Sequence, residues 1–181
     1  MIKLDMYKSC CFTGHRPQRL YGYDLSNNKY QVLAHKLAKI AYTLYTKYDV
    51  DTFFTGGALG ADTIAFFAIE YVKSKGIPVK NYVVVPFCGQ EKRWNAESID
   101  RYNRMLKASD GVIYIDQIFG LFPNKNCRVA DVLDRRNRYM VDNSKYIVTV
   151  FDGVRKGGTY NCINYAMNRY GDDKLIIDAG I

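Results

Sequence analysis

The fold class of this chain follows from one segment, Asp51-Thr52-Phe53-Phe54-Thr55-Gly56-Gly57-Ala58-Leu59-Gly60-Ala61-Asp62. Its first five residues form a short, mainly apolar run that ends in glycine, which is typical of a buried strand. A helical pattern then begins near Ala61 and continues to about Lys75, where Gly76 and Pro78 are stop signals. A strand that passes through a glycine turn into a helix is the basic unit of an α/β fold.

The same alternation of strand and helix patterns extends over the rest of the chain. The predicted strands are residues 10–13, 51–55, 82–85, 111–115, 146–151 and 175–177, and the predicted helices are about 32–45, 61–75, 94–107, 129–140 and 159–169. Because these strands are continuously apolar, crossover helices are expected to cover both faces of the sheet. The pattern predicts a Rossmann-like, three-layer α/β fold with a mostly parallel central sheet, and the length suits a single domain, residues 1–181.

The composition restricts the possible partners and locations. The formal net charge is +8, which favours an anionic partner, and the basic residues are spread along the chain rather than gathered in one block. No apolar run approaches the roughly 18–20 residues that span a bilayer, and the start does not resemble a secretory signal, so a cytoplasmic protein without membrane contact is expected. The tyrosine-rich first helix is a candidate contact face for a homo-oligomer.

Five cysteines, Cys10, Cys11, Cys88, Cys127 and Cys162, are unsuited to structural crosslinks. Their odd number, the adjacent pair and the lack of CxxC spacing argue against a disulfide framework and a zinc site. We therefore predict free thiols, no metal and no cofactor.

Three predicted strands end in glycine-bearing turns, which supply most of the candidate site. Ligands of parallel sheets bind beyond the carboxyl ends of the strands, where glycine lets the backbone approach an anion and helix N-termini offer free amides. The spacing matches neither GxGxxG nor a Walker A loop, and the alternative is a tight turn without a ligand. The predicted ligand-binding residues in these turns are Thr13, Gly14, Arg16, Thr55, Gly56, Gly57, Gly60, Asp62, Asp152, Gly157, Gly158 and Thr159.

The side chains of the first two turns have specific expected roles. Thr13 and Thr55 are expected to donate hydroxyl hydrogen bonds to phosphate, or else to satisfy the backbone of their turns. Arg16 suits a bidentate grip on phosphate, with a plain surface arginine as the alternative. His15 has no nucleophile near it in sequence and is expected to pack within its loop, with a role as an acid or base as the alternative.

Carboxylates and a third segment complete the candidate site. Asp62, in the first turn of a helix, is expected either to cap that helix or to contact a ribose, and Asp152 to contact a ribose hydroxyl or a base. After the strand at 82–85, Phe87, Gln90 and Trp94 are candidates to line one pocket, with an aromatic ring available to stack on a base. For Trp94 the alternative is a core position.

Taken together, these blocks resemble the YpsA-like branch of the SLOG superfamily. The matching residues are Thr13–Pro17, Gly57–Asp62, Pro86 and Phe87 with Gln90 and Trp94, and Asp152 and Gly153 with Gly157–Thr159. The resemblance runs from about Lys8 to Asn168. It implies a Rossmann-like fold that binds nucleotides or nucleotide-derived signals, often as a homo-oligomer.

The resemblance also bears on catalysis. The superfamily contains LOG-type phosphoribohydrolases, whose PGGxGTxxE signature ends in a catalytic glutamate, and this chain reads Lys156-Gly157-Gly158-Thr159-Tyr160-Asn161-Cys162, with Cys162 in the glutamate position. A thiol cannot stabilise an oxocarbenium-like centre as a carboxylate does, so no catalytic residue is predicted.

Three functions remain open on this basis. The first is non-catalytic sensing or sequestration of a nucleotide or a nucleotide-derived phosphorylated small molecule. The second is a nucleoside-monophosphate N-glycosidase that uses another carboxylate, such as Asp62, Glu70 or Asp152. The third is binding of single-stranded nucleic acid, which the superfamily member DNA-processing protein A performs and the basic composition allows.

Overall fold

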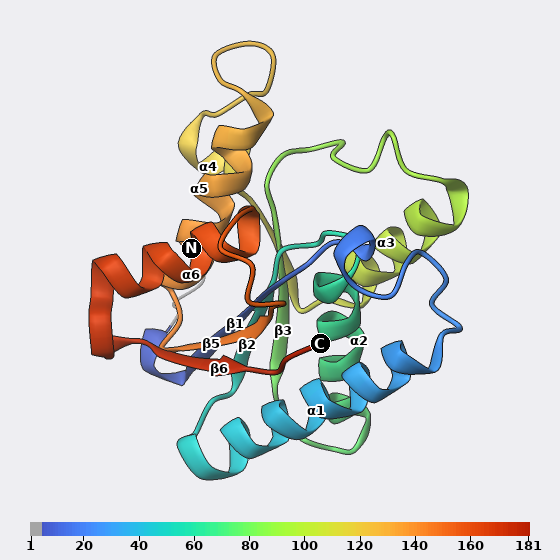
Figure 1. Cartoon of the computed structure of the whole chain (residues 1–181), viewed down its shortest axis with the longest axis vertical. Coiled ribbons are helices and arrows are strands. Elements are labelled where there is room, and N and C mark those ends of the chain that lie inside the picture. Colours follow the sequence, from blue (N-terminus) through green and yellow to red (C-terminus); the bar gives the residue numbers. More distant parts are fainter. Residues whose placement is uncertain (1–4) are drawn as a thin grey trace.

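Residues 5–181, which the computed structural model describes, contain a central sheet of six parallel strands in the order β4-β3-β2-β1-β5-β6 (Figure 1). The strands are β1 (Ser9–Gly14), β2 (Thr52–Thr55), β3 (Lys80–Val85), β4 (Gly111–Tyr114), β5 (Tyr146–Val150) and β6 (Leu175–Asp178). The α-helices are α1 (Asn28–Tyr48), α2 (Ala61–Ser74), α3 (Ala96–Ala108), α4 (Ile115–Phe119), α5 (Val129–Asp142) and α6 (Gly158–Tyr170). This arrangement confirms the predicted Rossmann-like α/β fold.

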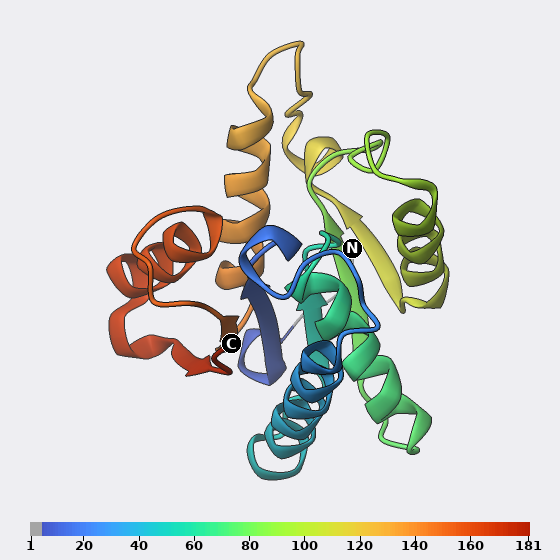
Figure 2. The same cartoon turned by 45° about the vertical axis from the view of Figure 1, so that its right-hand side comes forward.

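The two faces of the sheet are covered by different sets of helices (Figure 2). Alternate residues of a strand point to opposite faces, so Phe53 packs with the apolar residues of α1 and α2, whereas Phe54 packs with those of α5 and α6. The α3 residues Tyr102 and Met105 extend the first layer over β3. This double covering explains the apolar runs within the central strands, whereas β6, at the edge of the sheet, is mostly exposed.

The strand order creates one switch point, between β1 and β5. From β1 the chain moves outward through β2 and β3 to β4, then returns through α4 and α5 to β5 on the other side of β1. Gly14 pairs with Val150 at the carboxyl ends of these two strands. The crevice at such a switch point is where open α/β sheets bind their ligands.

The structure differs from the prediction in small respects. Ile115 begins the short helix α4 rather than ending β4. The prediction extends the strand to Ile115 because this residue continues an apolar run that has no break in the sequence. Helix α3 begins at Ala96, where the side chain of Asn95 accepts a hydrogen bond from the Ser98 amide, so Trp94 lies in the turn before it. No helix of residues 5–181 is both long enough and apolar enough to cross a bilayer.

Candidate functional site

Two adjoining pockets lie at the carboxyl edge of the sheet. The first, of about 360 Å³, occupies the switch point and is lined by residues from the turns after β1 and β5 and by parts of α2, α5 and α6. The second, of about 450 Å³, lies between the segment after β3 and the α4–α5 connection. Arg16 and Leu133 line both pockets, so the two hollows meet at these side chains.

The predicted residues divide between these pockets in a simple way. Seven of them, Thr13, Gly14, Arg16, Asp62, Gly157, Gly158 and Thr159, line the first pocket. Phe87, Gln90, Trp94 and again Arg16 line the second. The remaining predicted residues, Thr55, Gly56, Gly57, Gly60 and Asp152, line neither.

The N-terminus of α6 faces the first pocket. Gly157 precedes the helix with φ +91°, a conformation that favours glycine, and its carbonyl accepts the first helical hydrogen bond from Asn161. The amides that follow have no partner within the helix, and the helix dipole adds partial positive charge. A side chain added at Gly158 would meet no atom within 4 Å, so this glycine borders open space.

Three arginines line the first pocket, and two of them are paired with aspartates. Arg19 holds Asp152 with contacts of 3.0 Å from Nε to Oδ2 and 2.7 Å from Nη2 to Oδ1, and also donates to the Lys156 carbonyl. Arg136 is buried and donates to Asp62 at 3.1 Å. The guanidinium of Arg16 has no hydrogen-bond or ion-pair partner among residues 5–181 and is exposed to solvent.

His15 ties the turns after β1 and β5 together. It is only 4% exposed; its Nε2 lies 2.9 Å from Oδ1 of Asp152, and its Nδ1 lies 3.4 Å from Oγ1 of Thr159. Hydrogen bonds from Arg19 chiefly, together with those from the Val154 amide and His15, hold the pKa of Asp152 well below its usual range. Asp152 therefore remains ionised at neutral pH and orients two residues that line the pocket.

The glycines after β2 are required by packing within the protein. A Cβ at Gly56 would collide with the guanidinium of Arg136, and one at Gly60, which has φ +89°, would lie 2.5 Å from the His15 carbonyl oxygen. Gly57, at φ +65°, lies against Val83. These contacts account for the three glycines without a ligand, and their assignment to a phosphate site stays a prediction.

Thr55 differs from its counterpart Thr13. Its side chain is fully buried, and its hydroxyl oxygen has no hydrogen-bond partner. Residue 13 follows Phe12, which packs in the α1 and α2 layer, so its own side chain points to the opposite face, where the first pocket lies. A direct contact of Thr55 with phosphate also stays a prediction.

The second pocket combines aromatic and basic groups. Gln90 donates from Nε2 to the Gly57 carbonyl at 3.1 Å and to the Tyr102 hydroxyl at 3.2 Å, which fixes it in place. The Trp94 ring meets Tyr102 edge to face, with 5.4 Å between centroids, and is half-buried. Lys92 and Arg93 complete a basic rim.

The sequence reasoning missed the roles of Arg19 and Arg136. Arg136 shares one helical face with Val132 and Met140, both buried, and this spacing is a signal for a buried arginine. Arg19 lies in a polar loop, and its partner Asp152 is 133 residues away, so no local pattern indicates the pair.

Cys162, at the position of the LOG-type glutamate, lies beneath the first pocket. It is 2% exposed, and burial raises its pKa to about 11. The thiol is therefore neutral at physiological pH and is no nucleophile there.

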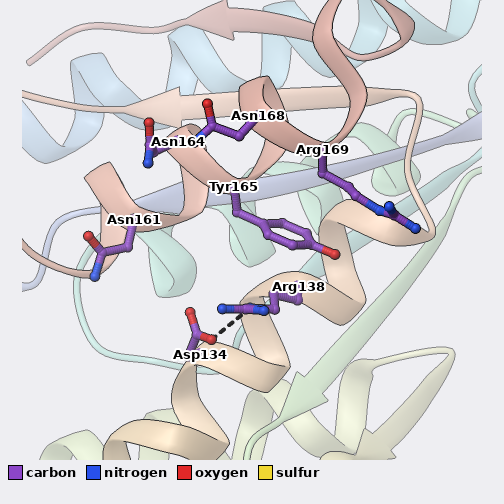
Figure 3. A pocket seen from close by; sticks show the side chains of 7 residues that line it. All are labelled: Asp134, Arg138, Asn161, Asn164, Tyr165, Asn168 and Arg169. Carbon is purple, nitrogen blue, oxygen red and sulfur yellow. Dashed lines mark ion pairs between the residues drawn. The ribbon is translucent and has the colours of Figure 1, made fainter.

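A further hollow, of about 550 Å³, opens between α5 and α6 and contains none of the predicted residues (Figure 3). Asn161, Asn164 and Asn168 extend from α6, and Arg138 pairs with Asp134 at 2.7 Å on α5. It is open to solvent along the helices and lies apart from the switch point.

Comparison with known proteins identifies the family of this chain. The sequence profile of the YspA SLOG family matches residues 10–177. The chain belongs to this family. The uncharacterized SPbeta prophage-derived protein YoqJ of Bacillus subtilis strain 168 is 37% identical to this SLOG protein over 141 residues, which cover 76% of this chain and 82% of YoqJ.

Two further proteins are similar to this chain at lower sequence identity. The UPF0398 protein BBR47_29830 of Brevibacillus brevis is 22% identical over 152 residues, which cover 84% of this chain and 77% of that protein. The X-ray structure of DNA processing protein A (DprA) from Streptococcus pneumoniae matches with a TM-score of 0.60 at 13% identity, over 94% of this chain and 49% of that one. This chain therefore spans about half the length of DprA, and the likeness concerns the fold.

Proposed function

We propose that this SLOG protein binds a nucleotide or a nucleotide-derived phosphorylated small molecule across the two adjoining pockets and does not turn it over. The observation that carries the proposal is the position of Arg16. Its guanidinium has no partner among residues 5–181 and lies where the two pockets meet. An unpaired guanidinium fork is a favourable group for bidentate contact with phosphate.

The first pocket suits the phosphate end. The N-terminus of α6 directs free amides and the positive end of a dipole toward it. Arg19 is paired with Asp152 and Arg136 with Asp62, which leaves the guanidinium of Arg16 as the unpaired charge that lines this pocket among residues 5–181. The local charge therefore favours an anion.

The second pocket suits a base. Phe87 and Trp94 supply aromatic surface, and the face of an aromatic ring stacks on any nucleobase. Gln90 is already held by Gly57 and Tyr102, so its contribution is to keep the pocket wall in place.

Binding without hydrolysis is favoured by the state of the acidic groups. Cys162 replaces the LOG-type glutamate, and Asp62 is committed to Arg136 and to the Ala58 amide at 3.2 Å. Glu70, an alternative carboxylate, accepts a hydrogen bond from Asn81 near the start of β3, at the opposite edge of the sheet. A general acid needs to lie within hydrogen-bond reach of the leaving base, and Glu70 is too far from the pockets for that role.

The test is to fill the first pocket without straining the fold. Gly158→Leu projects a side chain into open space at a residue whose φ is ordinary, so the protein should remain folded. Asn164→Leu, on the same helix but in the α5–α6 hollow, is the matched control. Calorimetric titration with the four nucleoside 5′-monophosphates and their nucleosides should show binding that requires the phosphate and is lost only in Gly158→Leu.

The same samples separate the alternatives. Release of free base, followed by chromatography, would identify an N-glycosidase and overturn binding without turnover. Binding of a single-stranded oligonucleotide that weakens steeply with salt, with no monophosphate binding, would favour a nucleic-acid protein. Mass spectrometry of small molecules released from freshly purified, denatured protein would identify a natural ligand directly.

A further inference from the structure

A groove lies between α1 and α2, apart from the two switch-point pockets. Figure 1 shows these two helices side by side on one face of the sheet. It measures about 460 Å³, and its floor is formed by the buried Ala38 and Val72 with Ile77 beside them. Tyr42 of α1 and Tyr71 of α2 form part of its walls. The groove is therefore an apolar channel between two helices.

The aromatic walls are unusually open to solvent. Tyr42 and Tyr71 are each 50% exposed, and Val32, on the same helix as Tyr42, is 67% exposed. A single exposed apolar residue needs no explanation, but two exposed aromatic rings that line one groove are typical of a surface that binds another molecule. Tyrosines are favoured at such surfaces because they offer large contact area and a polar tip.

The charge around the groove has one sign. Helix α1 carries Lys29, Lys36, Lys39 and Lys47 but no aspartate or glutamate in its 21 residues. Lys39, Lys75 and His35 line the groove, and no carboxylate does among residues 5–181. On α3, by contrast, Arg101 and Arg104 pair with Glu97 and Asp100. Among residues 5–181, Lys39 and Lys75 have no carboxylate partner, and the Lys75 ammonium lies over the Tyr71 ring, 4.8 Å from its centroid.

We propose that this groove docks an acidic amphipathic segment of another protein. Apolar side chains of the segment enter between Tyr42 and Tyr71, and its carboxylates face Lys39 and Lys75. A second copy of this chain is a poorer occupant, because a twofold contact through this surface would place its lysines against the same lysines. The prediction of a homo-oligomer through α1 is thus the competing outcome of the test.

The test uses charge reversal in the full-length protein. Three fluorescein-labelled peptides of about 15 residues, roughly four helical turns, share leucine and phenylalanine at the buried positions and carry glutamate, serine or lysine elsewhere. Fluorescence anisotropy should show that the glutamate peptide binds at least about tenfold more tightly than the other two, a difference of about 1.4 kcal/mol. The Lys39→Glu/Lys75→Glu variant should reverse this order and bind the lysine peptide best, because the groove then has the opposite charge.

Two controls keep the result interpretable. Lys47→Glu changes the charge of α1 outside the groove and should leave the preference for the glutamate peptide in place. The Tyr42→Ser/Tyr71→Ser variant should bind the glutamate peptide about tenfold or more weakly, while circular dichroism should show that the fold is retained. Reversal of preference cannot result from unfolding, which would abolish all binding.

Several outcomes overturn the proposal. Equal affinity for the three peptides would remove the charge argument. A dimer in sedimentation velocity that Tyr42→Ser/Tyr71→Ser dissociates would assign the groove to a second copy. Binding of oligo-dT that Lys39→Glu/Lys75→Glu abolishes, without binding of the glutamate peptide, would assign it to nucleic acid. None of these results depends on whether the switch-point pockets bind a nucleotide.

Discussion

Replacing Arg16 by alanine tests whether the two pockets serve one anionic ligand. In the folded protein the guanidinium contacts no hydrogen-bond or ion-pair partner among residues 5–181, so its removal leaves no buried group unsatisfied. The stability of Arg16→Ala should therefore stay within about 0.5 kcal/mol of the parent protein. The loss should appear in ligand affinity alone.

The size of that loss follows from the contact that Arg16 would make. Hydrogen bonds to a charged group contribute about 1.5–3 kcal/mol, and Arg16 is exposed, so the lower half of the range is the better expectation. At about 1.4 kcal/mol for each factor of ten, the affinity for a nucleoside monophosphate should fall roughly ten- to fortyfold. Arg16→Lys keeps the charge but not the fork, and should lie between the two proteins.

Isothermal titration calorimetry at fixed ionic strength measures this effect. Arg104→Ala is the control, because it removes a surface arginine from α3, whose contact is an exposed pair with Asp100. The reasoning is refuted if Arg16→Ala and Arg104→Ala bind the nucleotide with the affinity of the parent protein. It is also refuted if Arg16→Ala loses as much affinity for the nucleoside as for its monophosphate, since the guanidinium is assigned to the phosphate.

Further predictions concern stability, thiol reactivity and pH. Asp62→Ala should destabilise the protein by about 3–5 kcal/mol in urea unfolding, because it leaves the buried Arg136 unpaired, and adding Arg136→Met should recover much of that loss. At pH 7.5 iodoacetamide should label the exposed Cys88 and spare Cys162, whose pKa is raised to about 11; equal labelling rates in a peptide map would contradict its burial. Asp152→Asn should lower stability at pH 7, and the difference should shrink as the pH falls below about 4, because a carboxyl with a lowered pKa stabilises the folded state only while ionised. A difference that is unchanged down to pH 2 would argue against the pairing of Asp152 with Arg19.

Most of the fold could be predicted because strands that are buried on both faces have continuous apolar runs in the sequence. Phe53 and Phe54 are adjacent yet pack into opposite layers. A strand with one exposed face would alternate apolar and polar residues, so two adjacent apolar residues indicate a strand that is buried on both faces. A continuous apolar run is also the reason why α4 was not predicted. Ile115 extends the apolar run of β4, and a helix of five residues has too little periodicity to be distinguished from a strand.

The candidate site was less accessible to sequence reasoning. A glycine required for close approach looks the same in sequence whether its neighbour is a ligand or another part of the protein. Gly56 and Gly60 make room for Arg136 and the His15 backbone, whereas Gly158 borders an open pocket. The pairs Arg19 with Asp152 and Arg136 with Asp62 join residues 133 and 74 positions apart, so only the folded chain reveals them.

The close packing at Gly60 joins the loop after β1 to the start of α2. The Ala61 amide donates to the His15 carbonyl at 3.1 Å, and Gly60 leaves no gap between that carbonyl and the start of α2. Helix α2 continues from this contact and reaches about 15 Å from Ala61 to Tyr71 at 1.5 Å per residue. Tyr71 and Val72, near the far end of that helix, line the groove between α1 and α2, so one rigid element extends from the loop of His15 and Arg16 to the outer surface.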